Sequence, residues 1–367
     1  MIDVFNPPAR SGSQPGQAST LLRGLPFDLL YALLAAWLIG GLYLDGWAHN
    51  HLAETLESFI TPWHGVFYAG FAATAALLIG ITVHSRRAGL DWGASVPAGY
   101  VPSLAGVGLF AVGGVVDSIW HTLFGIEVSV DALVSPPHLL LALGLGLIVS
   151  GPVSSAWRRT EAPEGSGLIA PLLSLTLTLS LLTFFTQFAN PFGEAWSTES
   201  TVRDHAPLLG ALPATLTGDI TPIIGVVSIL LQTGLLMGAI LLIVRRWTLP
   251  IGSLTLLIGL NILLVSFLND QQRLIPAALF AGLIADLLAL RIRPWTNRRG
   301  FVLFGLAVPA NLYLLYFATL LVADRVIWPG TLVLGSIILA AIVGGLLALA
   351  LVANEPATRS WARTPAR

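Results

Sequence analysis

Long apolar segments follow one another along this chain, with only short polar stretches between them. They lie at residues 27–45, 64–83, 100–120, 138–156, 168–188, 221–244, 249–268, 274–290, 301–322 and 331–353. A helix needs about 20 mainly apolar residues to cross the hydrocarbon core of a bilayer. The sequence therefore predicts an all-α fold, a polytopic membrane helical bundle of about 10 transmembrane helices.

The composition supports this fold class and excludes others. Hydrophobic residues make up 55% of the 367 residues and charged residues only 10%, and the mean hydropathy is +0.81, well outside the range of ordinary water-soluble domains. A net charge of −1 gives no basic surplus for binding nucleic acid. The chain has no cysteine and two methionines, so a bound metal would have nitrogen and oxygen ligands, which suits copper(II), iron or zinc.

The arginines are distributed unevenly over the loops between the apolar segments. Fifteen of the 18 cations fall on one side of the predicted bundle, and only Arg203, Arg273 and Arg325 fall on the other. Loops rich in cations stay in the cytoplasm, so both termini are predicted to be cytoplasmic. The predicted organisation is a disordered cytoplasmic tail (1–26), a duplicated four-helix membrane unit (27–157), a six-helix membrane unit (158–353) and a second cytoplasmic tail (354–367).

One pattern of acids, prolines and histidines occurs twice in the first unit. Each copy has an Asp-x3-His pair at the end of one apolar segment and a Pro-x-His at the start of the next, preceded by a further acid. The first copy contains Asp45, His49, Glu57, Pro62 and His64, and the second contains Asp117, His121, Asp131, Pro136 and His138. The two copies are one helical hairpin apart, so they are predicted to open on the same, extracytoplasmic side of the membrane.

These residue types and spacings predict a transition-metal site. Residues four apart share a helix face, which puts each aspartate beside its histidine. Thr61-Pro62 and Ser135-Pro136 have the form of an N-cap followed by a proline at the first helical position. The predicted metal ligands are Asp45, His49, His64, Asp117, His121 and His138, in one shared site or in two Asp-His-His sites, with Glu57 and Asp131 orienting ligands or acting as general bases.

An Asp-x3-His pair on a membrane helix, with another histidine a dozen or so residues later, is similar to the metal site of the C subunit of copper membrane monooxygenases. The resemblance is local, and it implies that Asp45, His49 and His64, or their counterparts in the second copy, bind the metal. The spacing to the second histidine is longer here, and the duplication is not part of that family's pattern. The overall layout also resembles uncharacterised bacterial multi-pass membrane proteins.

Three classes of function are compatible with the sequence. The first is a metal-dependent membrane enzyme that oxidises or hydrolyses an apolar or lipid-like substrate, because three ligands per copy leave coordination positions open. The second is a metal or haem binding or transport protein, with His64 and His138 as haem ligands, although haem leaves the paired aspartates unexplained. The third is a structural membrane subunit.

Other polar residues have simpler interpretations. His51 lies beside the first copy of the motif. The loop at about 189–220 is predicted to be a solvated connector or a lid over the site. Asp286 lies about one helical turn from Arg291, and we expect it to snorkel or to pair there.

Overall fold

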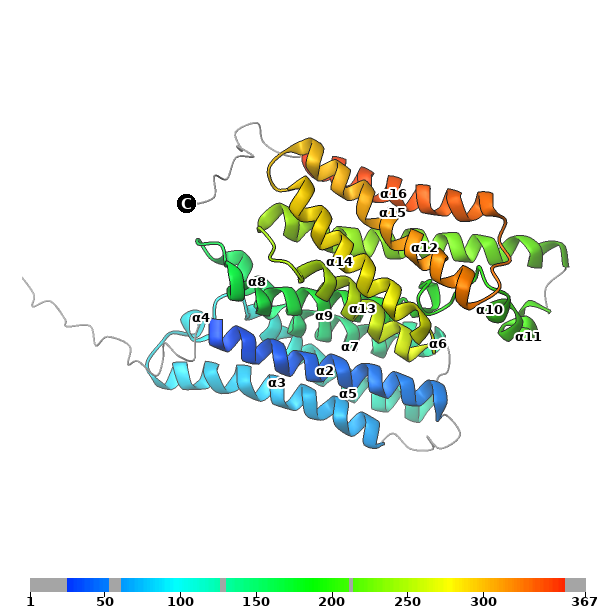
Figure 1. The fold of residues 1–367 in the computed structure, drawn as a ribbon. Helices are drawn as coiled ribbons and strands as arrows, with labels where there is room; N and C mark the ends of the chain where they lie inside the picture. The colour runs from blue at the N-terminus through cyan, green and yellow to red at the C-terminus, as the bar shows by residue number, and fades with distance from the viewer. Residues whose placement is uncertain (1–24, 53–60, 126–129, 211–213, 354–367) are drawn as a thin grey trace, which may run out of the picture.

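Helices account for nearly all of the chain that the computed structural model describes, namely residues 25–52, 61–125, 130–210 and 214–353 (Figure 1). Within these ranges the only β-type contact is an isolated antiparallel bridge between Thr198 and Val326. The predicted all-α, polytopic helical bundle is confirmed. The predicted tails lie outside the described ranges, except that Leu25 and Pro26 already belong to the first helix.

The first part of the bundle consists of two helical hairpins. Helix α2 packs along α3, and α5 packs along α7. The helices and their short connecting helices are α2 (Leu25–His51), α3 (Pro62–Arg87), α4 (Trp92–Ser95), α5 (Val101–Phe124), α6 (Val130–Val134), α7 (Pro136–Val149) and α8 (Gly151–Arg158). A side chain on Gly70 or Gly144 would place its Cβ 2.8 Å from the backbone of Leu38 or Phe110, so glycine lets both pairs of helices approach closely.

The second part of the bundle packs against the hairpins through α9, which contacts α2, α7, α12 and α13. In Figure 1 the hairpins lie on one side of α9, and the helices at the C-terminal end of the chain lie on the other. The longer helices of this part are α9 (Ile169–Phe185), α12 (Ala214–Arg246), α13 (Ser253–Leu268), α14 (Ile275–Ile292), α15 (Arg298–Ala323) and α16 (Gly330–Ala353). The short ones are η2 (Gly165–Leu168), η3 (Gln187–Ala189), α10 (Glu199–Asp204), α11 (Ala206–Leu209) and η4 (Gln272–Leu274).

Every predicted apolar segment falls on a helix, but two of these helices depart from a simple span. In the described ranges eight helices are long and apolar enough to cross a membrane, and α13 is shorter, with 16 residues. The segment predicted as one helix at 138–156 is broken into α7 and α8, which meet at 44°. Gly151 and Pro152 begin α8, and a Cβ on Gly151 would lie 2.5 Å from the Tyr100 ring. Proline cannot donate an intrahelical hydrogen bond, which explains the bend at this position.

Asp286 caps the start of a neighbouring helix, so the expectation that it snorkels or pairs with Arg291 is wrong. Its carboxylate accepts hydrogen bonds from the backbone N–H groups of Gly252, Leu254 and Thr255, each at 3.0 Å, and from the Thr255 hydroxyl at 2.7 Å. The N-terminal amides of a helix lack intrahelical acceptors and carry partial positive charge. Asp286 therefore fixes the start of α13 against α14.

Replacing Asp286 with alanine is expected to destabilise the fold by about 3 kcal/mol, because it leaves several buried donors without an acceptor. Thermal unfolding in detergent would measure the effect. Asp91→Ala is the matched control, because Asp91 precedes α4 without a side-chain capping bond. Equal unfolding midpoints for Asp286→Ala and Asp91→Ala would contradict the capping role.

The segment from Asn190 to Asp204 is docked on the connection between α15 and α16. Backbone hydrogen bonds join Ile327 N–H to Ser197 C=O and Glu199 N–H to Arg325 C=O, both at 2.9 Å. Arg273 adds an ion pair of 2.8 Å to Asp324, whose carboxylate also accepts from the Ser200 hydroxyl. Ser197 and Thr198 are buried. Residues 190–198 are therefore packed into the bundle and are not a solvated connector, whereas Arg203 and Asp204 are exposed.

Candidate metal centre

The first copy of the motif comes together where α2 ends and α3 begins. Asp45 and His49 lie one turn apart on α2, and Oδ2 of Asp45 is 3.9 Å from Nε2 of His49. Helix α3 begins at Pro62, and the Thr61 hydroxyl accepts a hydrogen bond from the backbone N–H of His64. This cap holds His64 in the first turn of α3, where its Nδ1 lies 3.2 Å from Oδ1 of Asp45.

The second copy comes together in the same way where α5 ends and α7 begins. Asp117 and His121 lie one turn apart on α5, and α7 begins at Pro136. Oδ1 of Asp117 lies 3.4 Å from Nε2 of His121 and also 3.4 Å from Nε2 of His138. One carboxylate oxygen therefore faces two imidazole nitrogens at equal distances.

Hydrogen bonds on the far side of each ring orient the two histidines of the second copy. Nδ1 of His121 lies 3.0 Å from the carbonyl oxygen of Gly125, to which it donates, and this places a lone pair on Nε2. Gly125 ends α5 with φ = +86°, a backbone conformation that favours glycine. Nδ1 of His138 lies 2.8 Å from the Ser135 hydroxyl. Both Nε2 atoms thus face Asp117.

The histidines of the first copy are less well oriented for metal binding than those of the second. The nitrogen of His64 that faces Asp45 is Nδ1, and the same atom lies 2.8 Å from the Thr61 hydroxyl. The side chain of His49 is 41% exposed, whereas that of His121 is 15% exposed. A metal in the first copy would require a rotation of His64 or the loss of its contact with Thr61.

The donor atoms of each copy lie close enough together to hold a metal ion. In each group the three donor atoms lie within 4.8 Å of one another, so Asp45, His49 and His64 form one group and Asp117, His121 and His138 form another. Nitrogen and oxygen ligands bound at about 2.0–2.2 Å to one ion lie about 3–3.5 Å apart, which matches the 3.4 Å distances around Asp117. Oδ1 of Asp45 is buried and lies 3.2 Å from Nδ1 of His64, but it accepts no well-aligned hydrogen bond from a described residue, and a buried carboxylate oxygen is costly without a compensating partner.

The structure thus forms two separate groups and no single site in which all six residues meet. We call them the first triad (Asp45, His49, His64) and the second triad (Asp117, His121, His138). The triads belong to hairpins that contact each other through α3 and α5. Tyr68, on α3, interacts with the carboxylates of both triads.

The other acids of the motif do not join the triads. Glu57 lies outside the described residues. Asp131 belongs to α6 and is exposed, and its carboxylate has no hydrogen bond or ion pair with another residue in the described ranges. Its proposed role as a base or as a partner of a ligand therefore has no contact in support of it.

His51 joins α2 to the connection between α13 and η4. Its Nδ1 lies 2.8 Å from the Trp47 carbonyl oxygen, and its Nε2 lies 2.7 Å from Oδ2 of Asp270. Both partners accept hydrogen bonds, so both ring nitrogens donate and the ring is an imidazolium when both bonds form. The hydrogen bond from His51 lowers the pKa of the Asp270 carboxyl below its ordinary value of 3.8.

Asp270→Asn is expected to lower the unfolding midpoint at about pH 6 and to lower it progressively less as the pH falls below the ordinary pKa of 3.8. The carboxyl group has a depressed pKa in the folded protein, so its contribution is present above its ordinary pKa and is lost as the pH falls through the folded-state pKa. The effect is small because the Asp270 side chain is 64% exposed. Thermal unfolding of both proteins from about pH 6 downward measures it, and a difference that does not shrink as the pH falls would contradict the ion pair.

Three residues of the centre were missed by sequence reasoning. Thr61 and Ser135 were interpreted only as helix caps, yet each also contacts Nδ1 of a triad histidine. Their shared place in the two Ser/Thr-Pro-x-His sequences was the available signal. Tyr68 had no such signal, because no tyrosine stands at the corresponding place in the second copy, which is Ala142.

Comparison with protein-family models finds no match to this chain. Neither the curated proteins nor the solved structures give a match. The resemblance to the metal site of copper membrane monooxygenases stays a prediction that rests on the residues of the motif.

Proposed function

We propose that the chain is a metal-dependent membrane enzyme in which each triad binds one transition-metal ion. The observation that carries this proposal is the second triad, where one aspartate oxygen lies 3.4 Å from each of two Nε2 atoms. The hydrogen bonds to Gly125 and Ser135 hold those nitrogens in place before any ion binds. Preorganised ligands of this kind are typical of metal sites.

One carboxylate and two imidazoles form the ligand set of two kinds of catalytic site. Such a set with open positions is used by non-haem iron in oxygen chemistry, and a similar set of three ligands is used by zinc in hydrolysis. A bound ion would supply redox or Lewis-acid chemistry to water, oxygen or substrate in the open positions. The protein's own contribution is to fix the ligands and to surround them with apolar helices, which favours an apolar or lipid-like substrate.

The distribution of arginines supports an extracytoplasmic position for both triads. Arg86 and Arg87 end α3 at the opposite end from His64, and Arg158 and Arg159 lie at or just beyond the end of α8. Cationic loops favour the cytoplasm. Reporter fusions placed after Arg87 and after Arg159 test this orientation, and an extracytoplasmic signal from either fusion would overturn it.

Transport and haem binding receive less support from the structure. On α2 the stretch between Asp28 and Asp45 contains no acid, base or amide, so this helix offers no polar path from the triad to its other end. His64 and His138 belong to different triads, and each faces its own aspartate. The paired aspartates are explained by metal binding and not by a haem held between two histidines.

Elemental analysis of the purified protein, followed by assays chosen according to the metal, tests the proposal. We expect one or two equivalents of iron, copper or zinc per chain. Iron or copper with oxygen consumption on an alkyl substrate supports an oxidase, and zinc with ester or amide cleavage supports a hydrolase. Protein that contains no transition metal and acquires none during dialysis against these ions would overturn the proposal.

A further inference from the structure

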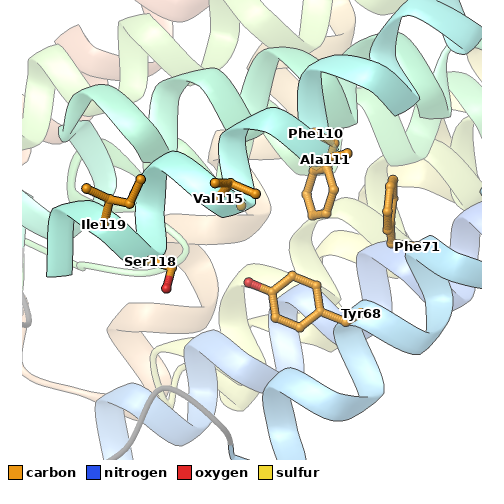
Figure 2. Close-up of a pocket in the computed structure, with 8 residues that line it drawn as sticks. Tyr68, Phe71, Phe110, Ala111, Val115, Ser118 and Ile119 are labelled. Carbon is orange, nitrogen blue, oxygen red and sulfur yellow. The ribbon is translucent and has the colours of Figure 1, made fainter. Parts of the chain in front are cut away.

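A pocket of about 400 Å³ lies between α3 and α5 and extends from the level of the second triad toward the middle of α5. Helix α3 contributes Tyr68 and Phe71, and α5 contributes Phe110, Gly114, Val115 and Ser118 to its wall (Figure 2). The volume is within the range of about 300–1,000 Å³ that is typical of small-molecule sites.

The pocket is polar at one end and apolar at the other. Figure 2 shows the Tyr68 hydroxyl turned toward the part of the pocket where Ser118 lies, and Phe71 and Phe110 at the opposite end. The polar end is the one nearer the triads. Tyr68 lies one turn after His64, with the two rings stacked at 6.0 Å, and Ser118 directly follows Asp117.

The surroundings of the pocket determine what reaches it. Both walls belong to helices long and apolar enough to span a membrane, so the medium outside them is the hydrocarbon of the bilayer. The side of α5 next to the pocket is exposed, with Val112 at 56%, Val115 at 62% and Ile119 at 54%. A molecule enters here from the bilayer, with its chain among the aromatic rings and its polar group at the hydroxyls.

We infer that this pocket binds a single linear alkyl chain of a fatty-acid-like amphiphile and presents its polar end to the triads. The binding of the chain is a property of the pocket alone. Its role as the substrate site rests on the proposed metal-dependent function. Tyr68 acts as a positioning residue, because its hydroxyl lies at the polar end of the pocket and its ring stacks on His64 of the first triad.

Gly114 offers a way to close the pocket without disturbing the helices. A Cβ added to Gly114 meets no atom within 4 Å, so Gly114→Leu extends into the pocket space. Gly108→Leu is the matched control, because Gly108 is on the same helix, its added Cβ also meets nothing within 4 Å, and it does not line the pocket.

The experiment uses palmitic acid that carries a photoreactive diazirine, added to the full chain in detergent. In the wild type and in the control variant Gly108→Leu we expect the probe to label α3 and α5 at the pocket. An excess of unlabelled palmitic acid is expected to prevent this labelling. In Gly114→Leu this labelling falls by about tenfold or more, which corresponds to about 1.4 kcal/mol of binding free energy. Equal labelling of both variants, or labelling spread without competition over all lipid-facing helices, would overturn the inference.

Three further measurements test this inference, and the first of them separates it from the proposed function. Metal content is expected to be unchanged in Gly114→Leu, so a loss of labelling with full metal content isolates the pocket. Because the chain has no cysteine, Val115→Cys introduces a unique thiol. A disulfide-linked dimer of this variant would show that a second copy covers the pocket and would overturn the alkyl-chain assignment. Tyr68→Phe is expected to keep the labelling but to change the position labelled along the chain.

Discussion

Asp117→Ala is expected to remove one tightly bound metal ion per chain, and Asp45→Ala is expected to remove a second ion that is held less tightly. Four-ligand structural zinc sites contribute about 10–16 kcal/mol, so one ligand contributes about 3 kcal/mol and its loss weakens binding at least ~100-fold. The order of affinities follows from the geometry, because the second triad has its imidazoles oriented and the first triad requires a rearrangement of His64. Metal titration with a chelator as competitor measures both affinities.

The control for these variants is Asp131→Ala, which removes an exposed acid close in sequence to the second triad. Asp131 has no described ligand contact, so this variant is expected to retain both ions. The double variant Asp45→Ala/Asp117→Ala is expected to contain none. Wild-type metal content in the double variant would show that the triads are not the ligands. The proposal of a metal-dependent enzyme at the triads would then give way to a binding or structural role for the chain.

The helical fold could be predicted because the thickness of the bilayer fixes the length of an apolar segment that spans it. The segment at 27–45 became α2 and the segment at 331–353 became α16, with ends shifted by a few residues. Two departures have different causes. The break at Gly151 and Pro152 has a local cause, because proline removes a helical hydrogen bond there, and an apolar segment of spanning length hides it. The role of Asp286 depends on the start of α13, which is distant in sequence.

The composition of each triad could also be predicted, because it depends on helix periodicity and on a proline that marks the start of a helix. Asp117 and His121 share a face of α5 by their spacing alone, and Pro136 places His138 in the first turn of α7. Whether the two copies share one site could not be predicted. That outcome depends on the packing between hairpins, and sequence spacing within a hairpin carries no information about it.

The two triads have the same ligands but differ in what holds them. In the second triad the Gly125 carbonyl and the Ser135 hydroxyl contact the Nδ1 atoms, and both Nε2 atoms face the aspartate. In the first triad the Thr61 hydroxyl contacts the nitrogen of His64 that itself faces Asp45. Because of this difference, we expect the second triad to bind a metal ion more tightly than the first. Substitution of the Thr61 and Ser135 hydroxyls therefore tests separately whether the triads bind metal.

Ser135→Ala is expected to weaken metal binding at the second triad by about 10- to 100-fold, as the loss of a hydrogen bond to a ligating histidine does in other metal sites. The Ser135 hydroxyl has no side-chain capping bond to α7, so the variant is expected to keep its unfolding midpoint without metal. Ser135→Thr retains the hydroxyl and is expected to restore the affinity.

Thr61→Ala provides the matched comparison at the first triad. Thr61 does cap α3 through the N–H of His64, so its loss is expected to cost about 1 kcal/mol of stability in addition to its effect on the metal. Chelator competition and thermal unfolding of the metal-free proteins separate the two effects.

A Ser135→Ala protein with unchanged metal affinity would show that this hydroxyl does not orient His138 for a metal. The same conclusion would follow if the affinity were lost only together with stability.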